Sequence, residues 1–337
     1  MPPSARSHRG NRGWCTAGLC LAFLLVLAPP AGAARTHSLA YHWPVKPFDR
    51  EHPIRALFGD PRTLATDQPF GRTGSGDGGV YSFHNGVDIV ADPGTPVYPV
   101  VSGRVVLAGR DEIVVRTPDG RRFQYWHLHR SVRRGRRVVV DRTVLGVVQS
   151  PQDHVHLGEI DSGIAQNPLA PGHLGPYHDH TAPEATGLYI ENGAGPVPMA
   201  TSLLRAHERL AVAAVDEPDL FFPGAYSNLP VSPALVEWRL LHAGAWTPWH
   251  TSADFRKTEP PAWHFWQVYA PGTYQNSPVF DHQLYPGTPG QYLFRIDLGA
   301  GRLSPGSYTL EVRVADIRGN SSTSSWPLRI AGRAVPR

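Results

Sequence analysis

Histidine and aspartate side chains of the kinds that bind zinc occur in three short stretches of the chain. These are His84-Asn85-Gly86-Val87-Asp88, Tyr125-Trp126-His127-Leu128 and His154-Val155-His156. A catalytic zinc site takes three protein ligands of the His, Asp and Glu types and leaves a fourth position for water. His84, Asp88 and one histidine of the third stretch meet that count. The residue types therefore predict a single-zinc hydrolase in which further histidines transfer protons near neutral pH.

The spacing of the histidines leaves open which of them bind the metal. Alternate side chains of a β-strand share a face, so His154 and His156 should project together, with Val155 on the opposite, packed side. His127 and His129 repeat the same pattern on a different predicted strand. The chain has 17 histidines, so one such pair by itself is weak evidence for a metal site.

The elements that must position these side chains are β-strands. From Trp43 to about Ile160 the chain has valine-rich runs separated by turn residues, and no stretch has a convincing helical period. Pro118-Asp119-Gly120 is typical of a hairpin turn. A Gly-rich segment, residues 71–79, predicts a mobile loop beside His84. The strands predicted in this part are residues 97–101, 104–108, 113–117, 121–128, 138–140 and 144–148.

A Pro-, Gly- and His-rich stretch, residues 167–183, indicates a domain boundary. We interpret His173, His178, Asp179 and His180 within it as linker residues rather than a second metal site. Separated strands follow the boundary and favour an immunoglobulin-like β-sandwich. These later strands are residues 210–215, 234–241, 292–298 and 308–315, and the predicted domains are residues 34–180 and 181–337.

Aromatic side chains gather in the second half of the chain. We expect them to pack in the protein interior rather than to bind glycan rings. They are Trp263, Phe265, Trp266, Tyr269 and Tyr274, with Trp246 and Trp249 nearby.

Residues 1–33 have the layout of a cleaved secretory signal, with three arginines, then an apolar run, then small residues. The apolar run is shorter than the roughly 20 residues that a membrane helix needs. We therefore expect an exported protein, periplasmic or extracellular, without stable membrane insertion after cleavage. The only cysteines, Cys15 and Cys20, lie in this segment, so the mature chain has no disulfide and no thiolate metal site.

The charge of the mature chain argues against nucleic acid as a partner. The whole chain has a net charge of +4, and the three arginines of residues 1–33 leave with the signal, which reduces it to +1. A net charge near zero gives no global argument for nucleic acid or an anionic membrane as a partner. One basic cluster remains, which either steers substrate carboxylates or is a solvated turn. It comprises Arg130, Arg133, Arg134, Arg136 and Arg137.

Taken in order, the motifs resemble those of the lysostaphin-type, or LytM-like, zinc peptidoglycan endopeptidases. Two further stretches belong to the pattern, Gly94-Thr95-Pro96-Val97-Tyr98 and Ser102-Gly103-Arg104-Val105. Trp43-Pro44-Val45 and Phe58-Gly59 resemble the usual beginning of that domain. The resemblance covers roughly residues 43–160, about a third of the chain.

This resemblance implies a mainly β protein with an antiparallel-sheet metallopeptidase domain and one Zn²⁺ bound by His84, Asp88 and His156. It also implies that His127 and His154 are catalytic, one as general base and the other stabilising the oxyanion. Peptidoglycan is the implied substrate and partner. We further expect the two predicted domains to contact each other. The alternative is a catalytically silent peptidoglycan-binding or hydrolase-activating module of the same fold.

The chain departs from the family around the last motif. Family members usually approach it through a Gly- and Thr-rich loop and follow it with Phe-Glu, whereas residues 146–153 lack that composition and Leu157-Gly158 follows. The departure leaves the ligands intact but affects the shape of one wall of the substrate groove. The sequence therefore does not indicate which peptidoglycan bond is cut. His129 is expected to be an extra surface histidine. Asp153 either orients a histidine or is a solvated loop residue.

Overall fold

The structure is a computed structural model that describes residues 41–63, 81–192, 195–205, 208–227, 229–277, 287–299 and 303–331. The predicted signal, both cysteines and the Gly-rich segment 71–79 lie outside the described residues. The division into domains at residues 180 and 181 stays a prediction, since residues 38–337 form one compact unit.

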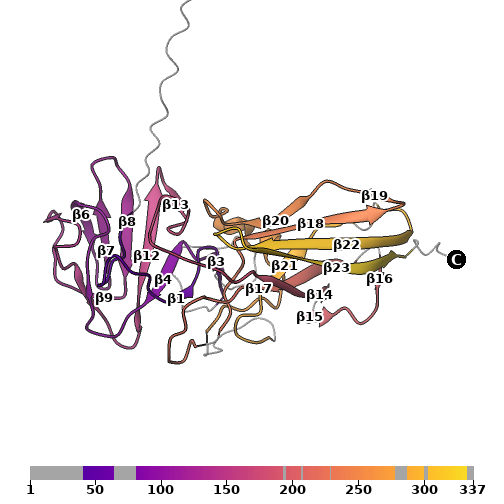
Figure 1. The fold of residues 1–337 in the computed structure, drawn as a ribbon, viewed down its shortest axis with the longest axis horizontal. Helices are drawn as coiled ribbons and strands as arrows, with labels where there is room; N and C mark the ends of the chain where they lie inside the picture. Colours follow the sequence, from indigo (N-terminus) through magenta and orange to yellow (C-terminus); the bar gives the residue numbers. More distant parts are fainter. Residues whose placement is uncertain are drawn as a thin grey trace, which may run out of the picture. The chain divides into compact units, whose positions relative to one another are not determined.

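The part of the chain with the histidine motifs is an antiparallel β-sheet with two small companion sheets (Figure 1). In spatial order the large sheet contains β1 (Ile54–Ala56), β4 (Gly86–Val90), β12 (His154–Asp161), β8 (Arg122–Trp126), β7 (Glu112–Arg116), β6 (Gly103–Ala108) and β10 (Arg137–Val138), and β13 (Ile164–Gln166) pairs with β12. The companion sheets are β5 (Pro96–Val97), β11 (Gly146–Val148) and β9 (Leu128–Arg130), and β2 (Pro61–Arg62) with β3 (Ser82–Phe83).

Strand β12 lies between β4 and β8 and aligns the three motifs. Its His156 is paired with Asp88 on β4 and with Trp126 on β8, the residue before His127. Val155 is fully buried on the opposite side of the strand, as the alternation predicts. The register of this sheet therefore brings together side chains that lie up to 72 positions apart.

One predicted strand, residues 121–128, is wrong in its extent. Strand β8 ends at Trp126, because His127 adopts a left-handed backbone conformation with φ 67° and breaks the ladder. Leu128 then begins β9, which belongs to a different sheet. His127 and His129 are consequently not an alternating pair on one strand. The hairpin predicted around Pro118-Asp119-Gly120 is confirmed as the connection of β7 to β8.

The rest of the described chain is also β. A four-stranded sheet contains β15 (Gly195–Pro198), β14 (Glu184–Asn192), β17 (Arg209–Val215) and β21 (Leu293–Ile296). A six-stranded sheet contains β16 (Leu203–Leu204), β23 (Ser321–Ile330), β22 (Gly306–Ala315), β18 (Leu235–His242) and β19 (Ala245–Trp246), and β20 (His250–Asp254) pairs with β18. One 3₁₀ turn, η1 (Ala262–His264), precedes one short helix, α1 (Phe265–Val268), among the described residues.

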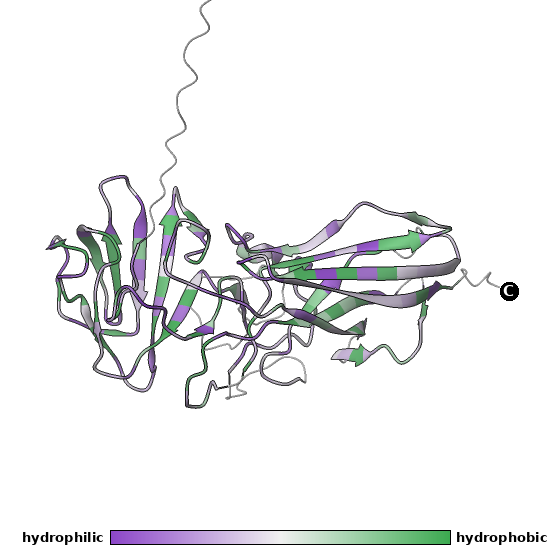
Figure 2. Ribbon diagram, viewed as in Figure 1, coloured by the Kyte–Doolittle hydropathy of each residue, from purple (hydrophilic) through white to green (hydrophobic). Residues whose placement is uncertain are grey.

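Alternating hydropathy explains these later strands. Along β22, apolar side chains at every second position are buried and those between them are partly exposed. Figure 2 shows the alternating hydropathy of this strand. The mainly β fold is thereby confirmed, while the immunoglobulin-like topology stays a prediction. Strand β23 was not predicted, because its first half is Ser and Thr with little apolar alternation.

Residues on both sides of the predicted boundary share one hydrophobic core that extends from Tyr41 to Ile330. Of the aromatic run, Phe265, Tyr269 and Tyr274 are buried, as expected, but Trp263 is 66% exposed. The ring of Phe83, next to His84, has its centroid 5.5 Å from that of Phe265. Strand β3, directly before His84, therefore packs against the later part of the chain.

Candidate metal centre

His84 is oriented by a tight segment of backbone before β4. Its backbone N–H donates to the carbonyl of Asp60 at 2.8 Å, and its ring Nδ1 lies 2.8 Å from the carbonyl oxygen of Leu57. A carbonyl can only accept, so Nδ1 carries the proton and Nε2 presents its lone pair. These two backbone contacts leave Nε2 of a neutral imidazole free to bind a cation.

Asp88 contributes one carboxylate oxygen from β4. Oδ2 accepts a hydrogen bond from Arg62 at 3.0 Å, and Oδ1 faces the histidines. Burial would raise the pKa of Asp88, but the nearby histidines and Arg62 hold it well below its usual range. The carboxylate is therefore ionised, with one oxygen paired and the other available.

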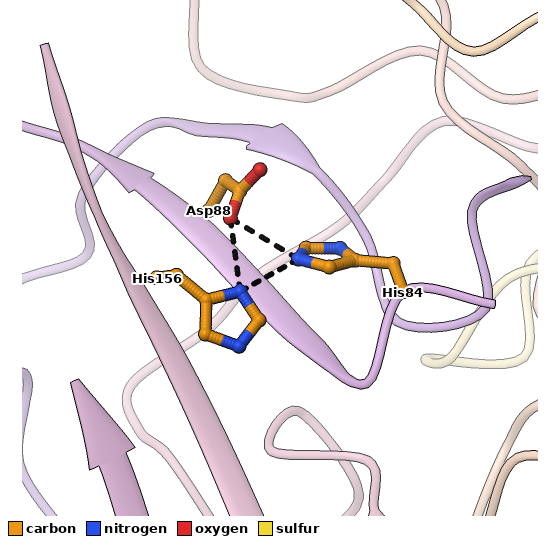
Figure 3. A group of neighbouring side chains, drawn as sticks. All are labelled: His84, Asp88 and His156. Carbon is orange, nitrogen blue, oxygen red and sulfur yellow. Dashed lines mark hydrogen bonds and ion pairs between the residues drawn. The ribbon is translucent and has the colours of Figure 1, made fainter. Parts of the chain in front are cut away.

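Three donor atoms converge at the centre, as Figure 3 shows. Nε2 of His84 lies 2.8 Å from Nδ1 of His156 and 3.1 Å from Oδ1 of Asp88, and the last two atoms are 3.2 Å apart. Two imidazole nitrogens and one carboxylate oxygen form a donor set that suits Zn²⁺. The residues therefore fit the metal that their types predict.

The surroundings of His84 keep it unprotonated. Burial and the charge of Arg62 lower its pKa to about 3. Metal binding requires a histidine without a proton on the donor nitrogen, so this shift removes competition from protons at neutral pH.

His154 and His127 lie beside the three donor atoms. Their ring centroids are 4.4 Å apart, and Nε2 of His154 is 3.7 Å from Oδ1 of Asp88. Burial lowers the pKa of His127 to about 4 and that of His154 well below its usual value. The structure thus brings all five predicted site residues together, although it tests none of their roles.

A backbone carbonyl, rather than Asp153, orients His154. Nδ1 of His154 lies 2.6 Å from the carbonyl oxygen of Gln152, while Asp153 is exposed. Nε2 of His154 then carries the lone pair and accepts a hydrogen bond from Arg55 at 3.2 Å. Of the two expectations for Asp153, the solvated loop residue agrees with this arrangement.

Arg55 and Arg62 are parts of the centre that the sequence analysis missed. They lie on β1 and β2, before the first motif, and no spacing relates them to the histidines. Arg55 is held from its other side by the ring of Tyr226, whose centroid is 3.9 Å from the guanidinium carbon. Only the folded chain brings these side chains to Asp88 and His154.

The other histidines and the basic cluster singled out in the sequence lie outside the centre. His129 and all five arginines of the basic cluster are exposed. In the linker, His173 pairs with Glu159, His178 with Glu51 and His180 with Asp219, at 2.7 to 3.0 Å. These pairs agree with the interpretation that the linker histidines form no metal site.

Comparison with known proteins supports the family resemblance. Residues 82–168 match the sequence profile of peptidase family M23. This range includes all three motifs, and the resemblance to the LytM-like peptidases is confirmed for this segment. No curated protein matches the chain by sequence.

Several solved structures are similar to part of the chain. One is a zinc-containing peptidase from Vibrio cholerae, with 20% identity and a TM-score of 0.30 over 38% of this chain and 39% of that one. Another is the SpoIIQ–SpoIIIAH pore-forming complex, with 23% identity and a TM-score of 0.30 over 39% of this chain and 90% of that one. Lysostaphin matches with 16% identity and a TM-score of 0.26 over 50% of this chain and 85% of its own.

Proposed function

We propose that this protein is an exported zinc metalloendopeptidase that hydrolyses peptide bonds in bacterial peptidoglycan. The observation that carries the proposal is the convergence of three donor atoms, from His84, Asp88 and His156, inside the segment that matches peptidase family M23. A zinc ion bound there would polarise the scissile carbonyl and lower the pKa of water toward 7.

The chain's own residues prepare the centre for that ion. The Leu57 carbonyl fixes the proton of His84 on Nδ1, and Arg62 occupies one oxygen of Asp88. Both interactions orient a ligand through the atom that does not face the centre, which is how outer partners sharpen metal sites. Peptide hydrolysis at this centre requires no serine or cysteine nucleophile.

We assign the proton transfer to His154 and His127. Nδ1 of His154 donates to the Gln152 carbonyl, so Nε2 carries the lone pair. This lone pair can take a proton from the attacking water once its hydrogen bond from Arg55 is broken. His127, whose ring centroid lies 4.4 Å from that of His154, then donates a hydrogen bond to the oxyanion of the tetrahedral intermediate. The same histidines return the proton to the leaving amine.

Peptidoglycan as the substrate and export as the location rest on the family resemblance and on residues 1–33. In the part of the chain that the structure describes, no helix has the length and hydropathy needed to cross a membrane. The bond that is cut is a cross-link or a stem-peptide bond, since both present a small, flat backbone.

The test is digestion of purified sacculi by residues 34–337 loaded with zinc, with released muropeptides identified by mass spectrometry. We expect new peptide termini that disappear with a chelator and return when zinc is restored. His129→Ala, at an exposed position outside the centre, serves as the matched control and should digest normally. If the zinc-loaded protein binds sacculi but cuts nothing, the silent binding or activating module is correct instead.

A further inference from the structure

Three aspartate side chains gather at a second place in the described chain. Asp179 belongs to the linker, for which the sequence predicted no metal site, but the fold places its carboxylate beside those of Asp216, which follows β17, and Asp316, which follows β22. Each offers a carboxylate oxygen within 4.8 Å of the others. Their residues are only 7%, 1% and 2% exposed, respectively. Three carboxylates from three separate elements are thus brought together away from bulk water.

Most oxygens of this group have polar partners. Oδ1 of Asp316 accepts from the backbone N–H groups of Arg318, Gly319 and Asn320 at 2.5 to 2.9 Å, and Oδ2 accepts from the side chain of Asn320. Asp179 accepts from the N–H of Thr181 at 3.1 Å and from the hydroxyl of Tyr177 at 3.2 Å. These bonds fix the directions in which the two carboxylates point.

Asp216 is the exception. Its Oδ1 accepts from the N–H of Glu217 at 2.9 Å, but Oδ2 is fully buried and has no hydrogen-bond partner among the described residues. A buried carboxylate oxygen without a partner is costly. This oxygen belongs to the very carboxylate that faces Asp179 and Asp316, so a ligand at their meeting point would satisfy it.

Three buried carboxylates repel one another, so a proton or a cation must neutralise part of their charge. Burial raises the pKa of Asp216 to about 8, and the charges of Asp179, Asp316 and Asp219 act in the same direction. Burial and the charge of Asp316 raise the pKa of Asp179 to about 6. A bound divalent cation would reverse these effects, because it stabilises the ionised form of each carboxylate.

We propose that Asp179, Asp216 and Asp316 bind one Ca²⁺. The donors are all hard oxygens with no histidine among them, which favours Ca²⁺ or Mg²⁺ over zinc. Ca²⁺ is the better match, because it accepts irregular sets of carboxylates, whereas Mg²⁺ requires nearly octahedral geometry. This site lies outside the segment that matches peptidase family M23 and is separate from the histidine centre.

The ion would fasten the linker to the ends of two sheets. Contacts already hold the linker there: Arg318 donates to the carbonyl of Tyr177 at 3.0 Å, and Asn320 donates to the carbonyl of Asp179 at 2.8 Å. Calcium would add a bond between these elements that the unfolded chain cannot form. We therefore expect calcium to stabilise the folded protein by mass action.

The experiment measures calcium binding by the full mature chain. The protein is dialysed against calcium-free buffer with a slight excess of zinc, so that the histidine centre stays loaded. We expect calorimetric binding of one Ca²⁺ per chain, with a dissociation constant of about 0.1–1 mM, the range of extracellular modules. In excess calcium, the melting temperature should rise by about 5 °C.

Variants distinguish this site from others. Asp216→Asn should abolish the calcium-dependent rise and leave the melting temperature in calcium-free buffer nearly unchanged, because burial keeps this carboxyl mostly protonated at neutral pH when no ion is bound. Asp219→Asn, which changes a neighbouring carboxylate outside the group, should keep the response. As a measurement on the unmodified protein, Tb³⁺ should luminesce through excitation of Tyr177 and be displaced by Ca²⁺.

Four outcomes would overturn the proposal. They are the absence of calcium binding by the unmodified protein, an equal calcium response in Asp216→Asn, a response to Mg²⁺ alone, and a proton in place of the ion. In the last case calcium has no effect, and stability falls as pH rises through about 8 in the unmodified protein but not in Asp216→Asn.

Discussion

Backbone carbonyls decide which nitrogen carries the proton in two of the site histidines. The carbonyl of Leu57 accepts a hydrogen bond from Nδ1 of His84, and the carbonyl of Gln152 accepts one from Nδ1 of His154. Each imidazole therefore turns a lone pair toward Asp88. The residue-level chemistry depends as much on these two carbonyls as on the side chains themselves.

Removal of a ligand and removal of a proton-handling residue should have different effects. We expect His156→Ala to lose both zinc and turnover, because one of three converging donors is gone. His127→Ala should retain zinc while turnover falls by about 10²–10⁴-fold. Metal content by mass spectrometry and muropeptide release measure the two effects. Equal zinc loss in both variants would contradict the assigned roles.

The backbone of His127 predicts a conflict between activity and stability. Its φ of 67° is left-handed, a conformation that costs a non-glycine residue roughly 1–2 kcal/mol. We expect His127→Gly to lower turnover as much as His127→Ala does, without lowering the free energy of unfolding. His129→Gly, in strand β9, should instead cost about 0.5–1 kcal/mol.

Urea unfolding of the zinc-free variants makes this comparison, since a bound metal would mask the backbone effect. A larger loss of stability in His127→Gly than in His129→Gly would mean that the ring of His127 contributes more through packing than its backbone costs.

At this scale the sequence was sufficient for the five side chains and insufficient for their partners. His84, Asp88 and His156 stand in short motifs whose residue types already indicate a metal. Arg62 reaches Asp88 only because β2 pairs with β3, and no local pattern marks it. Asp153 looked suitable for orienting His154, but a carbonyl does so, and carbonyls leave no trace in a sequence.

Among the elements, the pairing of β4 with β12 requires a close approach of the two strands. Gly86 on β4 lies opposite Gly158, and a Cβ at Gly86 would be 2.4 Å from the carbonyl oxygen of Leu157 and 2.6 Å from the ring of His156. The glycine of the first motif is therefore needed for close approach. The ring of His156 on β12 explains why this position of the motif is a glycine.

We expect Gly86→Ala to weaken zinc binding, because either the ring of His156 or the strand pairing must shift. Overpacking of this kind costs about 1–3 kcal/mol. The control is Gly109→Ala in the β6–β7 connection of the same sheet, where the added Cβ would meet nothing closer than 3.5 Å. Zinc competition against a chromophoric chelator measures the affinities. Equal affinities would contradict the close approach.

Strand prediction succeeded where apolar alternation is strong and failed where one residue changes the path. The valine-rich strands β6 and β7 lie close to their predicted bounds. The strand expected over residues 121–128 divides at His127, whose left-handed backbone no pattern of the neighbouring residues predicts.

For the whole molecule, the motif-bearing sheet and the later strands share one core. Thr63 and Gln275 exchange two hydrogen bonds of 2.8 and 3.1 Å, and Ser232 donates to the buried carboxylate of Asp60 at 2.8 Å. The ring of Phe255 lies over Gly59, where a Cβ would come within 2.3 Å of it. Residues of the later half thus support the turn that orients His84.

We expect Phe255→Ala to destabilise the entire protein by about 3–5 kcal/mol, as for other fully buried aromatic residues. Phe221→Ala, at a residue that is 71% exposed, should change stability by less than about 0.5 kcal/mol. Urea unfolding followed by fluorescence and by zinc release should give coincident transitions. Separate transitions, with zinc release unaffected by Phe255→Ala, would show that the two halves unfold independently.

The contact of Phe255 with Gly59 limits how the two halves of the chain can be recombined, both in evolution and in protein engineering. Peptidase segments of secreted proteins are often regarded as modules that can be recombined with new targeting partners. Here Gly59 and Asp60 are matched to Phe255 and Ser232, nearly two hundred positions away. A chimera that exchanges the later half must bring partners for this turn, or it will disturb the orientation of His84. The two halves are expected to evolve as a pair.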